Sequence, residues 1–283
     1  MPSNELTPSA IAKVKVQKTD SDTPSSDSVV VEEPLEIRIK RGGKDEQLGI
    51  TMRTPGNDLE LAAGFLWGEG FLQNPNELIS VKVCGDKELS ARQRANVVIA
   101  EVTENSQGSV RILERRFTIT AACGVCGSTN IADLHKRGVT KVSRTTHTVQ
   151  ELAAMVSLLE GRQRIFEKTG GLHAAALVNP DGVAVWVRED VGRHNAVDKV
   201  IGAGLMAGVI PMANWTLIVS GRIGYELVQK AICAGVSAIV GVSAPSSLAV
   251  DLAAEFGLTL LAFARGGVAK HYLPNHNISE SQV

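Results

Sequence analysis

Aromatic residues and cysteines are scarce in this chain. Phe, Trp and Tyr make up 4% of its 283 residues, and there are four cysteines. The cysteines stand at positions 84, 123, 126 and 233, which is too few and too uneven for a disulfide framework. A reducing compartment, the cytoplasm, is therefore the expected location.

Neither sign of charge is in excess, since 29 Lys and Arg face 30 Asp and Glu. This balance argues against a protein that holds nucleic acid through a general basic field. No apolar run follows a basic start, so no secretory signal is expected. The most apolar stretch, 232–264, is interrupted by Pro245, Asp251 and Glu255 and does not fit a membrane span. Apolar residues still amount to 44%, enough for a sizeable core.

The first part of the chain divides into a polar tail and a small α+β domain. Residues 1–33 are rich in Ser, Thr, Pro, Asp and Lys without an apolar period, which predicts a disordered tail. Apolar and charged residues alternate over 35–39 and 48–52, as in a half-buried hairpin. A helix is expected from Leu59, capped by Asn57 or Asp58. Further strands are expected at 79–83, 97–102 and 110–113. The domain is placed at 34–122.

Strands and helices alternate in the second part, over 148–276. A helix over 149–169, with Gly161 as a candidate break, leads into this region. Strands are expected at 174–178, 183–187, 217–219, 239–242 and 258–263. Helices are expected at 196–207, 225–234 and 247–256. The alternation predicts a layered α/β sheet, parallel at least in its second half. A loop and linker over 123–147 joins the two parts, and 277–283 forms a tail.

A pair of cysteines, Cys123 and Cys126, lies in this linker as Cys-Gly-Val-Cys. Two thiols at this spacing can share a metal, form a disulfide, or pass sulfur between them. Zinc needs two more ligands, and neither His135 nor His147 has finger spacing, so no bound metal is expected. A thioredoxin-like motif would open a βαβ unit, whereas this pair lies between domains. A flexible exposed loop is favoured over two inert buried thiols, because glycines flank the pair. A short helix over 131–136 would place Cys126 near its positive end.

Small and basic residues follow several strands of the second part. They include the segments Ser220-Gly221-Arg222, Ser243–Ser247 and Arg265-Gly266-Gly267. Such residues at helix starts bind phosphates, and the carboxyl ends of strands in open α/β sheets meet at one crevice. A nucleotide-like ligand is therefore expected there, although good turn sequences would look similar. The polar segment 188–195 is read as a binding loop, with a solvated turn as the alternative.

His173 begins an apolar strand, and this position invites comparison with the zinc deaminases. Zinc deaminases carry H-x-E followed by P-C-x-x-C, and here Ala175 occupies the glutamate position. No Pro-Cys-x-x-Cys occurs in the second part. Hydrolytic deamination is therefore excluded, although the order of strands and helices suits that fold.

Several long segments resemble the formate dehydrogenase accessory sulfurtransferase family (FdhD). They are MRTPGNDLELAAGFLWGEG at 52–70, CGVCGS at 123–128, TGGLHAAAL at 169–177, EDVGRHNAVDKVIG at 189–202, SGRIGYELVQKA at 220–231 and SAPSSLAVDLA at 243–253. The resemblance implies a second domain similar to the cytidine deaminase fold, an α/β sandwich, behind a smaller α+β domain. It also implies a persulfide relay from a cysteine desulfurase to the bis-molybdopterin guanine dinucleotide cofactor, which formate dehydrogenase requires.

The resemblance assigns roles to individual residues. Cys123 would carry the persulfide, and Cys126 would assist its transfer. The family's cofactor-contacting stretch just after the last strand falls on Phe263, Ala264, Arg265, Gly266, Gly267 and Val268. Apart from the resemblance, the position of Ser220, Gly221 and Arg222 between a strand and a helix predicts that they meet the phosphates of the guanine nucleotide.

Two other functions remain open at the level of sequence. One is a chaperone that binds the cofactor and whose cysteines are structural, and the other is a dithiol oxidoreductase. No nucleic acid or membrane partner is expected. The sequence names neither the desulfurase nor the formate dehydrogenase. A homodimer is expected mainly from the resemblance, with the small-residue helix over 201–208 packing either against a twin or within one chain.

Overall fold

The computed structural model describes residues 9–104, 106, 118–119 and 131–273, and the fold is a mixed α/β arrangement of two large sheets and a hairpin. The strand expected at 110–113, Cys123 and Cys126 lie outside these residues. In the part of the chain that is described, no helix has the length and apolar character needed to cross a membrane.

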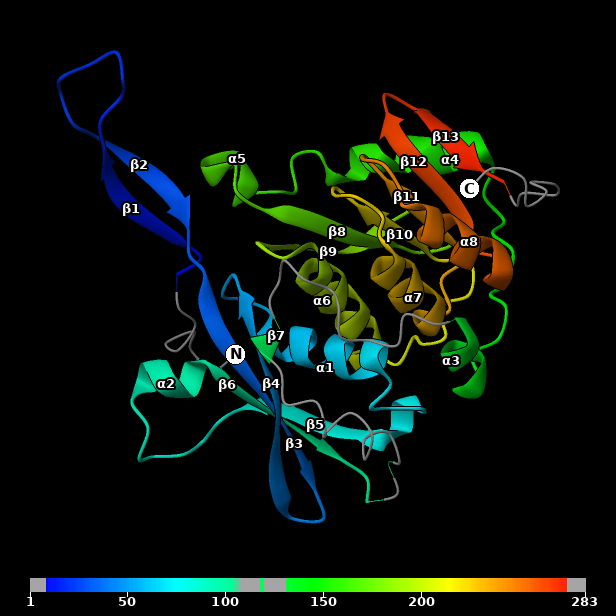
Figure 1. Cartoon of the computed structure of the whole chain (residues 1–283), viewed down its shortest axis with the longest axis horizontal. Coiled ribbons are helices and arrows are strands. Elements are labelled where there is room, and N and C mark those ends of the chain that lie inside the picture. The colour runs from blue at the N-terminus through cyan, green and yellow to red at the C-terminus, as the bar shows by residue number, and fades with distance from the viewer. Residues whose placement is uncertain (1–8, 105, 107–117, 120–130, 274–283) are drawn as a thin grey trace, which may run out of the picture.

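The amino-terminal segment forms a hairpin of β1 (Ile11–Val16) and β2 (Ser25–Val30), with Ile11 opposite Val30. The disordered tail predicted over 1–33 is therefore wrong for these residues. Ala12, Val14 and Val16 alternate with polar residues, as in a strand. The alternation is too short to predict a hairpin, because mostly Ser and Asp residues follow it. The hairpin projects from the body and contacts it through the short helix α5 (Phe166–Thr169), which lies against β2 (Figure 1).

The first large sheet has the order β5-β6-β3-β4-β7. Its strands are β3 (Glu33–Arg41), β4 (Lys44–Arg53), β5 (Leu78–Val83), β6 (Val97–Val102) and β7 (Thr118–Ile119). Leu35, Ile37 and Ile39 are buried on one face, which confirms the predicted alternation. Gly42 and Gly43 both have positive φ, the conformation that a two-residue hairpin turn requires.

Three helices accompany this sheet: α1 (Asp58–Glu69), the 3-10 turn η1 (Pro75–Glu77) and α2 (Ala91–Ala95). The predicted helix starts one residue before Leu59. Asn57 precedes it with φ 59° and makes no side-chain cap, so its role is to turn the backbone.

The second large sheet has the order β13-β12-β11-β10-β8-β9. Its strands are β8 (His173–Val178), β9 (Ala184–Asp190), β10 (Thr216–Val219), β11 (Ala238–Gly241), β12 (Thr259–Arg265) and β13 (Val268–Tyr272). β10, β11 and β12 are parallel, which confirms the prediction for this half. β13 was not predicted, because it is short and follows the Gly266-Gly267 turn.

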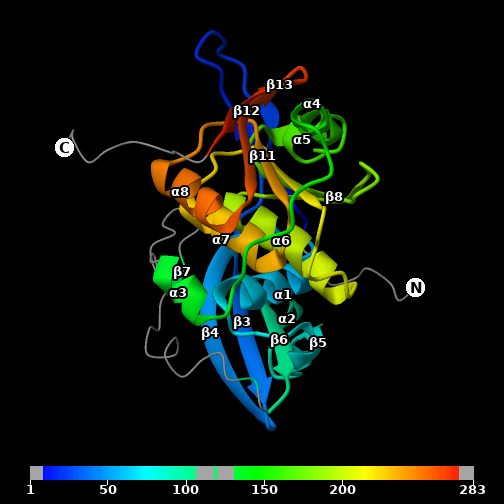
Figure 2. The same ribbon diagram turned by 90° about the vertical axis from the view of Figure 1, so that its right-hand side faces the viewer.

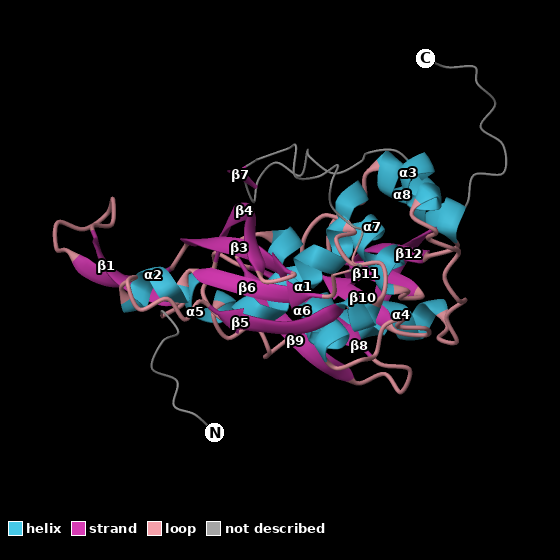
Figure 3. Cartoon of the chain, turned by 90° about the horizontal axis from the view of Figure 1, so that it is seen from below, coloured by secondary structure: helices cyan, strands magenta, loops and turns pink. Residues whose placement is uncertain are grey.

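The helices of the second half are α3 (Ile131–Lys136), α4 (Val149–Ala154), η2 (Met155–Leu159), α5, α6 (Arg193–Met206), α7 (Tyr225–Ala234) and α8 (Ser247–Phe256). The helix expected over 149–169 is interrupted: α4 tightens into η2 at Met155, and regular helix returns only in α5. Gly161, the candidate break, has φ 68° and lies in the interruption. α6, α7 and α8 cover one face of the second sheet, and α4 with η2 covers the other (Figures 2 and 3).

The two sheets are joined through helices α1 and α6, which cross closely at glycines. A Cβ on Gly64 would overlap the carbonyl oxygen of Asp198, and one on Gly202 would overlap that of Glu60. Nearby, the buried Nζ of Lys230 in α7 lies 2.8 Å from Asp198 and 3.1 Å from Glu69. Gly202 and Gly204 therefore pack within one chain, whereas residues 206–208 are exposed.

Candidate functional site

A cavity of about 670 Å³ opens at the carboxyl ends of β10, β11 and β12. Four of the predicted site residues line it: Ser220, Ala264, Arg265 and Gly266. The remaining lining comes from η2, α5 and the segment before β8. Strand ends from one sheet thus bring together members of two of the three predicted segments, Ser220 and Arg265-Gly266, while no residue of Ser243–Ser247 lines the cavity.

The segment 263–268 does not follow the last strand, contrary to the expectation from the resemblance. Phe263, Ala264 and Arg265 end β12, Gly266 and Gly267 form the turn, and Val268 begins β13. Arg265 pairs with Val268 across the turn. Both glycines have positive φ and nothing within 4 Å of a Cβ position, so their need for glycine is conformational.

Phe263 holds an unusual backbone conformation beside the cavity. Its φ is 55°, it lies within a register shift of β12 against β13, and its ring is 44% exposed. The amine of Lys270 stands 4.7 Å from the ring centroid. A bulky residue in the left-handed region is strained, and such strain is found mostly at functional positions. Phe263, Gly267 and Val268 nevertheless do not line the cavity.

Ser220 and Gly221 are packed tightly against the start of β8. The Ser220 hydroxyl accepts a hydrogen bond of 2.8 Å from the amide of Ala174. A Cβ on Gly221 would lie 3.1 Å from Nδ1 of His173, so glycine is needed for this approach. Arg222 is exposed and does not line the cavity, which separates it from Ser220.

His173 lies at the cavity in a positively charged environment. Burial lowers the pKa of its imidazole, and the neighbouring charges of Arg193, His194 and Arg222 lower it further. Nε2 of His194 is 3.7 Å from the carboxylate of Glu226, and that contact lowers the pKa of Glu226. The imidazole of His173 is therefore neutral near pH 7, and an anion bound beside it would favour its protonated form.

The polar segment 188–195 has mainly a structural role in its central residues. The fully buried carboxylate of Asp190 lies 2.7 Å from the amine of Lys199 and accepts bonds from Asn195 and Gly192, both of 2.9 Å. Asn195 also donates to the carbonyl of Met52. Helix α6 starts at Arg193 rather than at Ala196, so Asn195 is no helix cap. This network fixes the turn that presents Arg193 and His194.

The expected phosphate contact at the start of α8 is already occupied by protein groups. The Ser246 side chain caps the helix by accepting from the amide of Ala249, at 3.3 Å. The amide of Ser246 donates to the carbonyl of Ile223, at 3.0 Å. Ser246 and Ser247 are also absent from the cavity lining, so this part of the predicted site is not brought to it.

Several cavity residues were not among the predicted site residues. Gly170, Gly171, Leu172 and His173 belong to the conspicuous segment 169–177, so a signal for them existed. Glu160 and Gln163 come from the irregular region between η2 and α5, Phe166 is the first residue of α5, and nothing in the sequence singled them out. Among residues 9–104, 106, 118–119 and 131–273, no group of three His, Cys, Asp or Glu could hold a metal ion.

The cysteine segment adjoins described elements on both sides. β7 pairs with β4 so that Ile119 stands opposite Thr51, and the Thr51 hydroxyl donates to Asn195, at 3.3 Å. Cys123 follows Ile119 by four residues, a chain length of at most about 14 Å. Of the two other cysteines, Cys84 is buried and Cys233 is partly buried, and both are free thiols.

Comparisons with known proteins agree with one another. A model of the FdhD/NarQ family matches residues 30–279. A protein of Streptomyces avermitilis named sulfur carrier protein FdhD is 44% identical over 256 residues, which cover 89% of each chain. A protein of the same name from an Anaeromyxobacter species is 46% identical over 255 residues, covering 85% of this chain and 84% of its own. The fold is similar to the crystal structure of a putative formate dehydrogenase accessory protein from Desulfotalea psychrophila, with a TM-score of 0.69, 22% identity, and coverage of 95% and 98%.

Proposed function

The chain belongs to the FdhD/NarQ family, and from this membership we propose that it is a sulfur carrier acting as a sulfurtransferase. It takes persulfide sulfur from a cysteine desulfurase and delivers it to the bis-molybdopterin guanine dinucleotide cofactor, which formate dehydrogenase requires. Relatives named sulfur carrier protein FdhD, at 44–46% identity over most of the chain, support this role.

Cys123 carries the transferable sulfur in this proposal. Its thiolate attacks the outer sulfur of the donor's persulfide, so that a new S–S bond forms at Cys123 and the donor leaves as a thiolate. No oxidant is consumed. If Cys126 then attacks Cys123, a disulfide forms and hydrosulfide leaves, which resolves an undelivered persulfide.

The observation that carries the proposal is the convergence of distant motifs on the 670 Å³ cavity. Its volume suits one nucleotide end of the cofactor, which is substrate here. Arg265 provides positive charge and Gly266 leaves the backbone open to a ligand. The guanidinium of Arg193, which acts on His173, provides further positive potential.

The test is incubation of the purified protein with a cysteine desulfurase and cysteine, followed by mass spectrometry of the intact chain. We expect one added sulfur on the wild type and none on Cys123→Ala, which also fails to activate formate dehydrogenase. Cys84→Ser and Cys233→Ser serve as controls that keep the persulfide.

The same experiment separates the alternatives. A cofactor-binding chaperone would retain activation in Cys123→Ala, and that result would refute the sulfur relay. A dithiol oxidoreductase would reduce protein disulfides in a standard insulin assay, and the relay predicts no turnover there.

A further inference from the structure

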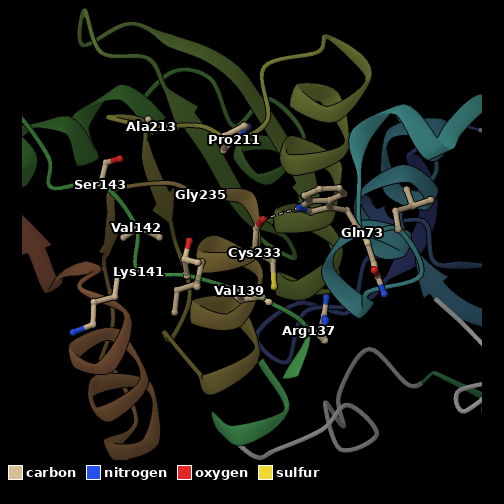
Figure 4. A pocket seen from close by; sticks show the side chains of 15 residues that line it. Gln73, Arg137, Val139, Lys141, Val142, Ser143, Pro211, Ala213, Cys233 and Gly235 are labelled. Carbon is tan, nitrogen blue, oxygen red and sulfur yellow. Dashed lines mark hydrogen bonds between the residues drawn. The ribbon is translucent and has the colours of Figure 1, made fainter. Parts of the chain in front are cut away.

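A second cavity, of about 360 Å³, lies at the opposite ends of the same strands. Its walls include Ala213 and Gly235, which precede β10 and β11, and the segment 137–143 that follows α3 (Figure 4). It shares no lining residue with the larger cavity. Nothing in the proposed sulfur relay uses it.

The floor of this second cavity is apolar and firmly built. Trp67, Leu72 and Ile232 are at most 8% exposed. The indole N–H of Trp67 donates to the carbonyl of Cys233, at 2.9 Å, so the ring contributes surface and no free donor. Burial raises the pKa of the Cys233 thiol, which therefore adds no negative charge. The floor suits an apolar side chain.

The rim is positively charged. Arg137 and Lys141 line the cavity, and among the residues that the structure describes no Asp or Glu does. They belong to a basic strap, residues 136–144, which carries Lys136, Arg137, Lys141 and Arg144, and no acidic residue occurs between Asp133 and Glu151. The carboxylate that acts on Cys233 is that of Glu69, which is paired with Lys230 at 3.1 Å. Within the described chain, no carboxylate forms a salt bridge with Arg137 or Lys141.

The two cations stand on different sides of the cavity (Figure 4). Arg137 lies beside Cys233, whereas Lys141 lies on the far side, with its side chain directed away from Cys233. A single phosphate group is best held by converging donors, whereas separated cations suit negative groups spaced along a chain. In an extended peptide, side chains on one face recur about every 6.5 Å. The balance of positive and negative charge over the whole chain also disfavours a nucleic acid as the occupant.

From these features we propose that the second cavity and the basic strap bind a short acidic segment of a protein partner, with an apolar side chain seated on Trp67 and carboxylates at Arg137 and Lys141. The site lies beside α3, whose first residue, Ile131, follows Cys126 by five residues. A partner held here therefore meets the molecule close to where the cysteine segment joins it. The binding itself requires no sulfur transfer.

The test uses fluorescence anisotropy of a fluorescein-labelled peptide of alternating Glu and Leu, titrated with the full chain at low ionic strength. We expect binding that weakens with added salt and that falls roughly tenfold in the double variant Arg137→Gln, Lys141→Gln. The matched control is Lys44→Gln, Lys87→Gln, which removes the same charge from exposed positions elsewhere and keeps the affinity.

A second variant distinguishes insertion of the peptide's apolar side chain into the cavity from simple electrostatic attraction of the peptide to a basic surface. Ala213→Phe keeps every charge and fills the cavity from its exposed wall, so it also weakens binding. Circular dichroism melts show that the variants remain folded. The proposal is overturned if the wild type does not bind the peptide, if the control pair loses as much affinity, if Ala213→Phe binds normally, or if a single-stranded oligonucleotide of equal charge binds more tightly. Because no desulfurase or cofactor is present, the result is independent of the sulfur relay.

Discussion

His173 is an unusual neighbour for an anionic ligand, because its imidazole is held neutral by burial and by the charges of Arg193, His194 and Arg222. A phosphate bound in the larger cavity would oppose those charges and raise the pKa of His173, so binding would take up a proton. The sign follows directly: a ligand that prefers the protonated form binds more tightly as pH falls through the pKa of the imidazole.

We therefore predict that the affinity for guanosine diphosphate, relative to that of His173→Gln, rises as pH falls from 7.5 to 5.5. The rise is about tenfold for each unit by which the ligand raises the pKa. Calorimetric titrations of both proteins measure it, and the variant corrects for the ligand's own titration. A constant ratio across this pH range would exclude a role for His173 in anion binding.

Arg265 is expected to contribute directly to nucleotide affinity. A charge-assisted contact is worth about 1.5–3 kcal/mol, so Arg265→Ala should weaken guanosine diphosphate binding about ten- to a hundredfold without unfolding the protein. The control is Arg144→Ala, which removes an exposed arginine from the basic strap, outside the larger cavity. Calorimetry distinguishes this from a solvated Arg265, whose loss would leave the affinity unchanged.

At the residue level the sequence located the larger cavity through its motifs and misassigned some of their members. Ser220 and Arg265 line it, but Arg222 does not, because three residues after the end of β10 the chain has turned toward α7. Asp190 and Asn195 form a dense polar cluster in the sequence. Their burial, which makes them structural, depends on contacts with Met52 and Thr54 over a hundred positions away.

The crossing of α1 and α6 is the tightest contact between elements. Gly202→Ala would force its methyl group into the carbonyl of Glu60, a backbone atom that cannot move alone. We predict that the free energy of unfolding falls by about 2–3 kcal/mol. Urea unfolding measures it against Gly85→Ala, whose added methyl meets nothing within 4 Å. Equal stability of the two variants would mean that the helices separate at little cost.

Elements with a strong apolar period were predictable, and those held by tertiary contacts were not. β3 and β4 show alternation, β6 is a nearly continuous run of buried residues, and α7 and α8 begin and end at the predicted residues. The helix expected over 149–169 is shorter than predicted, because η2 packs its apolar residues against the sheet without continuing the α-helix. The hairpin of β1 and β2 was missed, because most of its residues are polar and exposed.

At the scale of the whole molecule, a symmetric dimer is the expected state. Residues 201–205 are buried in the chain's own core, so a twin would contact this segment only through the exposed residues 206–208. Exposed apolar residues lie on both outer strands of the second sheet, Val185 on β9 and Val268 on β13, at 44% and 72% exposure. Unpaired edges of this kind favour association. Sedimentation velocity should give the mass of two chains, and a monomer at every concentration would contradict the expectation.

The placement of the two cavities has a consequence for the order of events. They open at opposite ends of parallel strands and share no residue, so filling one leaves the entrance to the other unobstructed. The order of binding is then not fixed. A protein bound at the basic strap and a nucleotide bound beside Arg265 can arrive in either order and remain together. Kinetically, such a molecule passes through a ternary complex, and raising the concentration of one occupant would not inhibit the other.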